Sequence, residues 1–215
     1  ARASEYFRLL AKADSVVCIS EHTRDGIWQR LRRDRALPIS VAYPGGDHLP
    51  AKQPTTRDEG PTRFVRVGTL EARKFPVEIA EAFANARAQG MEAELLFVGR
   101  PSASESTIND AIQRACDSCV GISWIWDAND DEVAFHIDRA DAFLSFGVEG
   151  YGIPVLEAIR AGTPVLFGGV QPAAELMVGR GAAQVASLEP ASLAEALNRF
   201  SVATGRQELT NSIDP

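Results

Sequence analysis

Short apolar runs alternate with helical segments along most of this chain, and this alternation limits the folds that are open to it. Strands are expected at residues 63–70, 94–99, 120–124 and 141–146, each followed by an expected helix, and the alternation continues to about residue 200. Parallel strands need crossover connections, which are usually helices. The expected fold class is therefore α/β, with a Rossmann-like parallel sheet flanked by helices.

The composition changes twice along the chain, and these changes suggest domain boundaries. Residues 1–50 read as a helix, a strand, a helix capped by Ser20 and a further strand, which is a βα unit followed by a crossover. Residues 51–62 are polar and rich in proline, as in a linker. Residues 63–201 hold the regular alternation, and residues 202–215 have little apolar content and are expected to form a tail.

The stretch EGYGIPVLEAIRAGTPVLFGG carries the clearest functional signal. A buried strand ends in a loop that holds Glu149, Gly150 and Gly152, and Pro154 opens a helix. Glycines let a backbone approach a ligand closely, and the first turn of a helix offers unpaired N–H groups to an anion. Glu157 lies opposite the apolar face of this helix, so it points either into a cleft or into solvent.

This stretch resembles the signature of family-4 retaining glycosyltransferases of GT-B fold: a Glu, seven residues, then a second Glu, with Gly-aromatic-Gly-Ile-Pro between them. The match extends over the consecutive residues EGYGIPVLEAIRAGTPVL. By this resemblance, residues 63–201 are the C-terminal nucleotide-sugar-binding domain of a GT-B enzyme. Residues 1–50 resemble the end of the N-terminal acceptor-side domain. A chain of this extent is expected to be an incomplete enzyme that binds donor weakly and transfers little sugar alone.

The loop VGTLEARK follows the first strand of the expected domain, and its glycine and basic pair suit a pyrophosphate. By resemblance, Lys74 contacts the donor phosphates. Many family members carry an arginine where this chain has Thr69, so Arg73 either takes over that charge or lies on the surface. Phe75 and Ala174 also depart from the family pattern, where a small or polar residue and a proline are common.

The two signature glutamates receive different roles from the resemblance. Glu149 is the catalytic candidate beside the donor sugar, where a carboxylate would stabilise positive charge that develops at the anomeric carbon. Glu157 would bind the ribose hydroxyls. The donor-binding set expected from the sequence is Thr69, Arg73, Lys74, Gly150, Tyr151, Gly152, Ile153 and Glu157.

A pocket for the nucleotide base is expected between residues 99–102 and 124–130. Arg100 and Trp126 are its candidate residues. An indole can stack on a base, but a tryptophan in an apolar run more often belongs to the core. No metal or other cofactor is expected, since Lys74 and the helix dipole would neutralise the diphosphate.

The net charge and the cysteine content indicate which classes of partner and which cellular compartment are expected. The formal net charge of −7 argues against a nucleic-acid partner, which would need a basic face. A short basic cluster at Arg30, Arg32, Arg33 and Arg35 reads as a solvated helix end, with peripheral membrane contact as the alternative. Three free cysteines and the lack of a membrane-spanning run suit the cytoplasm, or the inner face of its membrane.

These observations favour a retaining hexosyltransferase that moves a sugar, such as mannose, from a GDP- or UDP-sugar to a glycan or lipid-linked acceptor during polysaccharide biosynthesis. The alternative is a non-catalytic module of the same fold that binds a nucleotide-sugar or a protein partner. An NAD-dependent oxidoreductase is disfavoured, because no G-x-G-x-x-G follows the first strand of the domain.

Overall fold

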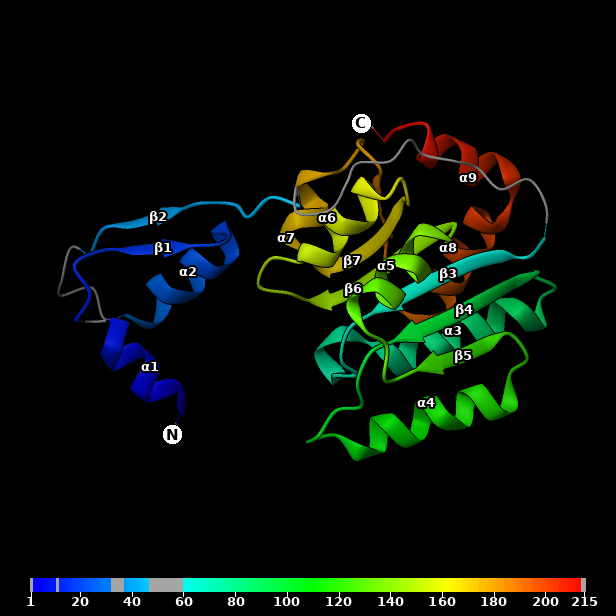
Figure 1. Cartoon of the computed structure of the whole chain (residues 1–215), viewed down its shortest axis with the longest axis horizontal. Helices are drawn as coiled ribbons and strands as arrows, with labels where there is room; N and C mark the ends of the chain where they lie inside the picture. The colour runs from blue at the N-terminus through cyan, green and yellow to red at the C-terminus, as the bar shows by residue number, and fades with distance from the viewer. Residues whose placement is uncertain (1, 11, 32–36, 47–59, 214–215) are drawn as a thin grey trace.

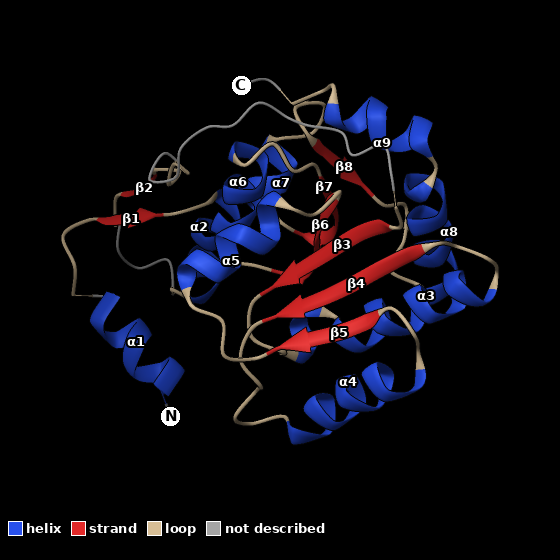
Figure 2. Cartoon of the chain, turned by 45° about the vertical axis from the view of Figure 1, so that its right-hand side comes forward, coloured by secondary structure: helices blue, strands red, loops and turns tan. Residues whose placement is uncertain are grey.

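A six-stranded parallel sheet forms the centre of the molecule (Figure 2). The computed structural model describes residues 2–10, 12–31, 37–46 and 60–213. The strands lie in the order β5-β4-β3-β6-β7-β8, and each neighbouring pair is parallel. Their bounds are β3 Thr62–Val67, β4 Ala93–Val98, β5 Ile122–Ile125, β6 Ala142–Val148, β7 Val165–Val170 and β8 Ala182–Gln184. The expected fold class is confirmed.

Helices cover both faces of this sheet, as the crossover connections require. One face carries α3 (Pro76–Ala88), α4 (Ser106–Ser118) and α8 (Pro190–Ser201), which share one hydrophobic cluster with the sheet. The other face carries α5 (Asp130–Asp138), α6 (Ile153–Arg160) and α7 (Pro172–Leu176), which share a second cluster. The sheet therefore has two cores, and its polar loops are left at the strand ends.

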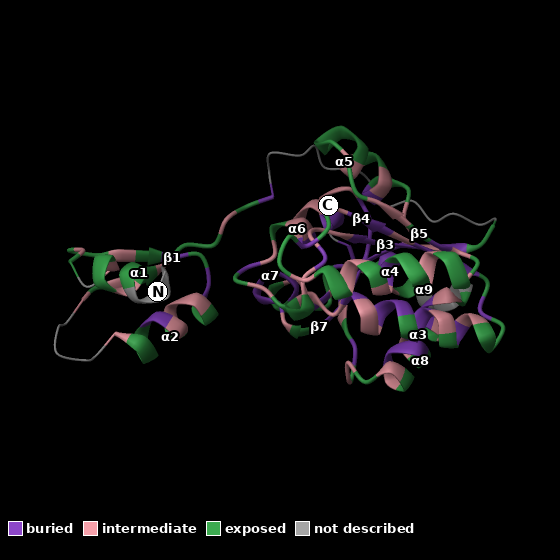
Figure 3. Ribbon diagram, turned by 90° about the horizontal axis from the view of Figure 1, so that it is seen from below, coloured by how far each residue is buried: buried purple, intermediate pink, exposed green. Residues whose placement is uncertain are grey.

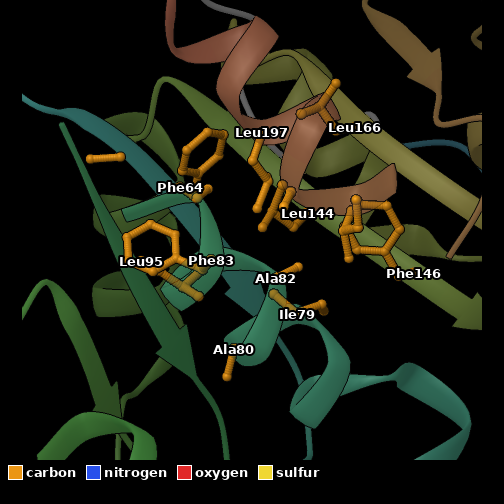
Figure 4. Packing of buried hydrophobic residues seen from close by; sticks show 14 of the residues in the cluster. Phe64, Ile79, Ala80, Ala82, Phe83, Leu95, Leu144, Phe146, Leu166 and Leu197 are labelled. Atoms are coloured by element: carbon orange, nitrogen blue, oxygen red, sulfur yellow. The ribbon is translucent and has the colours of Figure 1, made fainter. Parts of the chain in front are cut away.

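The larger core is aromatic and aliphatic, and its buried residues come mainly from the strands β3 to β7 and from the helices α3, α4 and α8. Phe64 of β3 packs edge-on against Phe83 of α3, with ring centroids 6.4 Å apart. Leu95, Leu144 and Leu197 bring β4, β6 and α8 into the same cluster (Figure 4). Buried positions are concentrated in the strands and in the inner faces of α3 and α8 (Figure 3). This packing fixes the relative positions of the strand ends.

The N-terminal segment forms a smaller unit that lies beside the end of the large sheet where α6 and α7 pack (Figure 1). It consists of α1 (Arg2–Leu10), β1 (Val16–Cys18), α2 (Glu21–Arg30) and β2 (Ile39–Val41), and β1 pairs with β2 in parallel. Ser20 caps α2, as expected, by accepting a hydrogen bond from the N–H of Thr23 at 3.1 Å. The expected βα unit is present, and residues 32–36, which follow α2 closely, lie outside the described residues.

The expectation of a tail at residues 202–215 was wrong for most of that segment. A helix, α9 (Ala203–Thr210), follows α8, and Thr210 and Ile213 are buried. Few apolar residues are needed there, because Leu209 packs against the larger core and Ile213 against the smaller one. The expected linker falls mostly on residues 51–59, which lie outside the described residues.

Among the described residues, no helix combines the length and the apolar character that crossing a membrane requires. The longest described helices have 13 residues, whereas about 20 are needed to span a bilayer.

Candidate functional site

The strand order reverses direction between β3 and β6. From β3 the chain adds β4 and β5 on one side, and from β6 it adds β7 and β8 on the other. The loops that leave β3 and β6 start at the carboxyl ends of these two strands, where open α/β sheets place their ligand crevice. Ligands of open α/β sheets bind at such a reversal point. The loop after β3 continues into a short 3₁₀ helix, η1 (Ala72–Lys74), and the loop after β6 leads to α6.

Charged side chains from these two loops meet directly. Glu149, in the loop after β6, receives Lys74 Nζ on one carboxylate oxygen and Arg73 Nη1 on the other, each at 3.0 Å. Arg73 Nη1 also donates to the carbonyl of Val148 at 2.6 Å, and Arg73 Nη2 lies 2.6 Å from Glu71. The structure thus brings together the sequence-predicted Arg73, Lys74 and Glu149. The Arg73 side chain is exposed and is paired with Glu149 and Glu71.

The ion pairs change the protonation of Glu149. Its partial burial favours the neutral acid, but the hydrogen bonds and charges of Lys74 and Arg73 outweigh burial, so the pKa of Glu149 lies below its ordinary value. Burial disfavours the charge on Arg73, but Glu149 and Glu71 raise its pKa. The carboxylate and the guanidinium are therefore both charged at neutral pH.

A buried arginine, which the sequence analysis missed, lies beneath the loop after β3. Arg66 is 3% exposed, and its guanidinium donates to the carbonyls of Gly68 and Thr69, the latter at 3.1 Å. Burial lowers the pKa of Arg66 to about 10, against the favourable charges of Glu149 and Glu71, so the side chain remains cationic at neutral pH. Arg66 stands between apolar residues in the run FVRV (residues 64–67), and an arginine at such a position was a signal that could have identified it.

Arg66 also orients the backbone of this loop. A trans peptide places its C=O and N–H on opposite sides, and no described peptide bond is cis. Because the Gly68 carbonyl faces Arg66, the N–H of Thr69 points away from the guanidinium. In the described part of the chain this N–H has no hydrogen-bond acceptor. Thr69 therefore presents a free donor from its backbone where many family members have an arginine.

The glycine loop after β6 is anchored by backbone hydrogen bonds to the end of β7 and the start of α7. Gly152 caps α6 in a left-handed conformation (φ 100°) that an L side chain would strain, and no side chain caps this helix. The Tyr151 carbonyl accepts the N–H of Ala173 at 2.9 Å, and the Glu149 N–H donates to Val170 at 2.9 Å. The first turn of α6 is consequently available to an anion, and Ile153 at its start is exposed.

Two other predicted residues lie on or next to α6, in different surroundings. The Tyr151 side chain is buried and its hydroxyl donates to the Pro44 carbonyl at 2.9 Å, so this ring contacts the N-terminal segment. Glu157 is half-buried on α6, away from the buried face formed by Val155 and Ala158. Their proposed contacts to donor stay predictions.

The candidate base-pocket residues follow adjacent strands. Arg100 is exposed after β4, and Trp126 is exposed after β5, so the core interpretation of Trp126 was wrong. The neighbouring Trp124 is instead half-buried and donates its indole N–H to the Gly99 carbonyl at 2.9 Å. Glu105 joins this region to η1 by accepting the N–H of Ala72 at 3.1 Å.

Phe75, which departs from the resembled family's pattern, has a backbone conformation that is unusual for a large side chain. It is the non-glycine residue with positive φ (52°) in the described part of the chain, and it links η1 to α3. Small or polar residues tolerate this region better. Its ring packs partly against the larger core, which offsets part of the backbone cost.

The described residues contain no group of three or more His, Cys, Asp or Glu side chains that could hold a metal ion. The cations that face the crevice come from Arg73 and Lys74, with Arg66 buried below. The arrangement defines a site for an anion, built at the reversal point of a Rossmann-like sheet.

Residues 49–207 match the family model described as glycosyl transferases group 1. The match covers most of the chain, including both loops of the site. This chain belongs to that family.

Known proteins similar to this chain include the serotype-specific mannosyltransferase WbdA of Escherichia coli. Two such sequences are each 25% identical to this chain over 179 residues, covering 74% of it and 22% and 21% of their own lengths. The chain thus spans about a fifth of the length of the curated relatives it matches.

Solved structures share the fold. A trehalose-6-phosphate synthase from Burkholderia multivorans has a TM-score of 0.76 at 13% identity, covering 97% of this chain and 56% of its own. Anabaena HepE, in complex with UDP and glucose, has a TM-score of 0.71 at 17% identity, covering 93% and 57%. The lipopolysaccharide outer core galactosyltransferase WaaB has a TM-score of 0.64 at 20% identity, covering 94% and 57%. The sheet and its helices therefore have the GT-B architecture.

Proposed function

We propose that this chain is the donor-binding part of a retaining glycosyltransferase of family 4, which moves a hexose from a nucleoside-diphosphate sugar to a glycan or lipid-linked acceptor. The observation that carries the proposal is the joining of Arg73, Lys74 and Glu149 at the reversal point of the sheet. A sugar diphosphate needs cations on its leaving group and an acidic group beside the sugar. These three side chains supply both.

Mannose is the first sugar to test. Support comes from the relatives named as mannosyltransferases. Glu149 would lie beside the sugar, Lys74 and Arg73 would bind the diphosphate, and Glu157 would bind the ribose. Arg100 and Trp126 would flank the base, and no metal is required in this scheme. The enzyme would work in the cytoplasm, with membrane contact through the basic cluster after α2 as a further hypothesis.

Calorimetric titration with UDP, GDP and ADP tests the donor site. We expect one of them to bind, and Lys74→Ala to weaken its binding by about 10- to 100-fold, because a charge-assisted contact to phosphate is lost. Arg199→Ala, which removes an exposed arginine on α8, is the control and should leave affinity unchanged. If none of the three nucleotides binds, or if Lys74→Ala binds as well as the wild type, the donor site is misplaced.

The alternative is a non-catalytic module of the same fold, which would bind nucleotide without turnover. Transfer assays with the full-length protein, GDP-mannose or UDP-sugars and a series of glycan acceptors separate the two. Sugar transfer supports the enzyme, and tight nucleotide binding with no transfer to any acceptor supports the module.

A further inference from the structure

Helix α2, from the N-terminal unit, reaches the glycine loop after β6. The hydroxyl of Ser20 donates to the carbonyl of Gly150 at 2.6 Å, and the hydroxyl of Thr23 donates to the same carbonyl at 3.2 Å. Ser20 is fully buried and Thr23 is half-buried. Two side chains from the first turn of one helix therefore converge on one backbone oxygen of the signature loop.

Counting protons shows which hydroxyl contributes more. Ser20 has one hydroxyl hydrogen, and its oxygen already accepts the N–H of Thr23, so its hydrogen is free for the short contact to Gly150. The Thr23 hydroxyl lies 3.0 Å from the Ser20 oxygen and 3.2 Å from the Gly150 carbonyl, so its hydrogen is shared between them. Ser20 is the primary donor and Thr23 reinforces it.

Fixing this carbonyl also fixes the next N–H group. The peptide between Gly150 and Tyr151 is planar and trans, so the N–H of Tyr151 points away from α2. The carbonyl of Tyr151 is held in turn by the N–H of Ala173, which turns the N–H of Gly152 away from α7. Within the described part of the chain, neither of these N–H groups has a hydrogen-bond acceptor. Both are held ready for an external one.

We propose that Ser20 and Thr23 are positioning residues for the donor site, which hold the glycine loop so that the N–H groups of Tyr151 and Gly152 meet the donor diphosphate. This inference rests on the proposed function. It means that the acceptor-side unit completes the donor site, although neither hydroxyl touches the donor.

A second set of contacts joins the connection after β2 to the glycine loop and α6. The hydroxyl of Tyr151 donates to the Pro44 carbonyl at 2.9 Å, and its ring stacks on Tyr43 with centroids 6.0 Å apart. Gly46 lies against α6, where an added Cβ would come within 2.9 Å of Leu156. The connection between the two units is therefore packed closely on the same loop and helix.

Two substitutions remove the proposed contacts with little other change. Thr23→Val keeps the shape of the side chain and removes the hydroxyl. Ser20→Gly removes the hydroxyl donor, and glycine is itself one of the residues preferred at a helix N-cap. Thr163→Val is the matched control, because Thr163 is a buried threonine that donates to the Ile137 carbonyl at 2.8 Å beyond the far end of α6.

Hydrogen–deuterium exchange of the peptide covering residues 149–156 measures how well the backbone of the loop is ordered, and it needs no ligand. We expect exchange to become about threefold faster or more in Thr23→Val and Ser20→Gly, and to stay unchanged in Thr163→Val. Titration with UDP and GDP should show about three- to tenfold weaker binding in the two variants, while binding of uridine or guanosine changes by less than about twofold.

The outcomes separate this inference from the proposed function. Unchanged loop exchange in both variants would overturn it, as would equal losses for nucleoside and nucleoside diphosphate. If the wild-type chain binds neither diphosphate, the proposed function fails and the donor-positioning role fails with it. The exchange result alone then decides whether the two hydroxyls order the loop.

Discussion

At the scale of single residues, the site holds more positive than negative charge. Arg66, Arg73 and Lys74 face the carboxylates of Glu71 and Glu149, so the cluster has one excess positive charge when all five are ionised. Without ligand, the two carboxylates neutralise most of the cationic charge. A diphosphate that enters this cluster competes with Glu149 for Arg73 and Lys74, which would release the carboxylate toward the sugar.

The lowered pKa of Glu149 gives a stability effect with a definite sign. Its ion pairs stabilise the fold fully above the ordinary pKa of 4.5, and this contribution is lost as the pH falls through the lower pKa of the folded state. We expect the stability advantage of the wild type over Glu149→Gln to shrink by about 0.5–1 kcal/mol between pH 7 and pH 3, since the pair is partly exposed. Urea unfolding at several pH values measures this. A difference that is constant with pH would contradict it.

At the scale of elements, the approach of η1 to β6 creates the site. Gly147 of β6 has φ 100°, and a Cβ at this position would collide with the carbonyl of Arg73. The absence of a side chain lets the two loops come close enough for Arg73 and Lys74 to reach Glu149. The same position shows why a strand glycine can be a functional residue.

Gly147→Ala should therefore disrupt both the fold and the site. We expect a loss of about 1–3 kcal/mol in unfolding free energy from the collision and the left-handed backbone, and clearly weaker nucleoside-diphosphate binding, because η1 must move. Thermal unfolding and calorimetric titration measure the two effects.

Gly90→Ala is the matched control for Gly147→Ala. Gly90 also has a positive φ (98°), but an added Cβ there meets no atom within 4 Å. It should cost about 1–2 kcal/mol from backbone strain alone and leave nucleotide affinity unchanged. Equal effects of the two substitutions on binding would show that the approach of η1 is unimportant.

At the scale of the whole molecule, local patterns predicted the strands and helices well. The alternation of apolar runs gave the parallel sheet, and the glycine signature identified the loop that begins α6. The predictions failed where long-range packing decides. Trp126 is exposed although its run is apolar, and α9 forms where the local composition is polar, because Leu209 and Ile213 complete cores built by distant residues.

The site residues were predictable where a local sequence pattern marks them and were missed where long-range packing places them. Lys74, Arg73 and Glu149 were predicted from the sequences of the loops that contain them. The burial of Arg66 and its contacts depend instead on the position of β3 in the sheet. The contact of Ser20 with Gly150 joins residues 130 positions apart, and no local pattern encodes it.

Helix α9 should contribute to stability and not to the site. Ile213 is buried beside Gly181 and Ile159, so Ile213→Ala should lower the unfolding free energy by about 2 kcal/mol through lost burial and a partial cavity. Glu208→Ala, at an exposed position on α9, should change it by less than about 0.5 kcal/mol. Urea unfolding compares the two. An unchanged stability in Ile213→Ala would mean that the segment that follows α9 is not docked in solution.

The reversal of strand order places 76 chain positions between Arg73 and Glu149. Bringing such distant residues together requires closure of a long loop that contains β4 and β5, so the site can form only after β6 has paired with β3. A newly made chain would acquire its anion site late in folding. A nucleotide able to occupy it would then bind finished molecules in preference to partly folded ones.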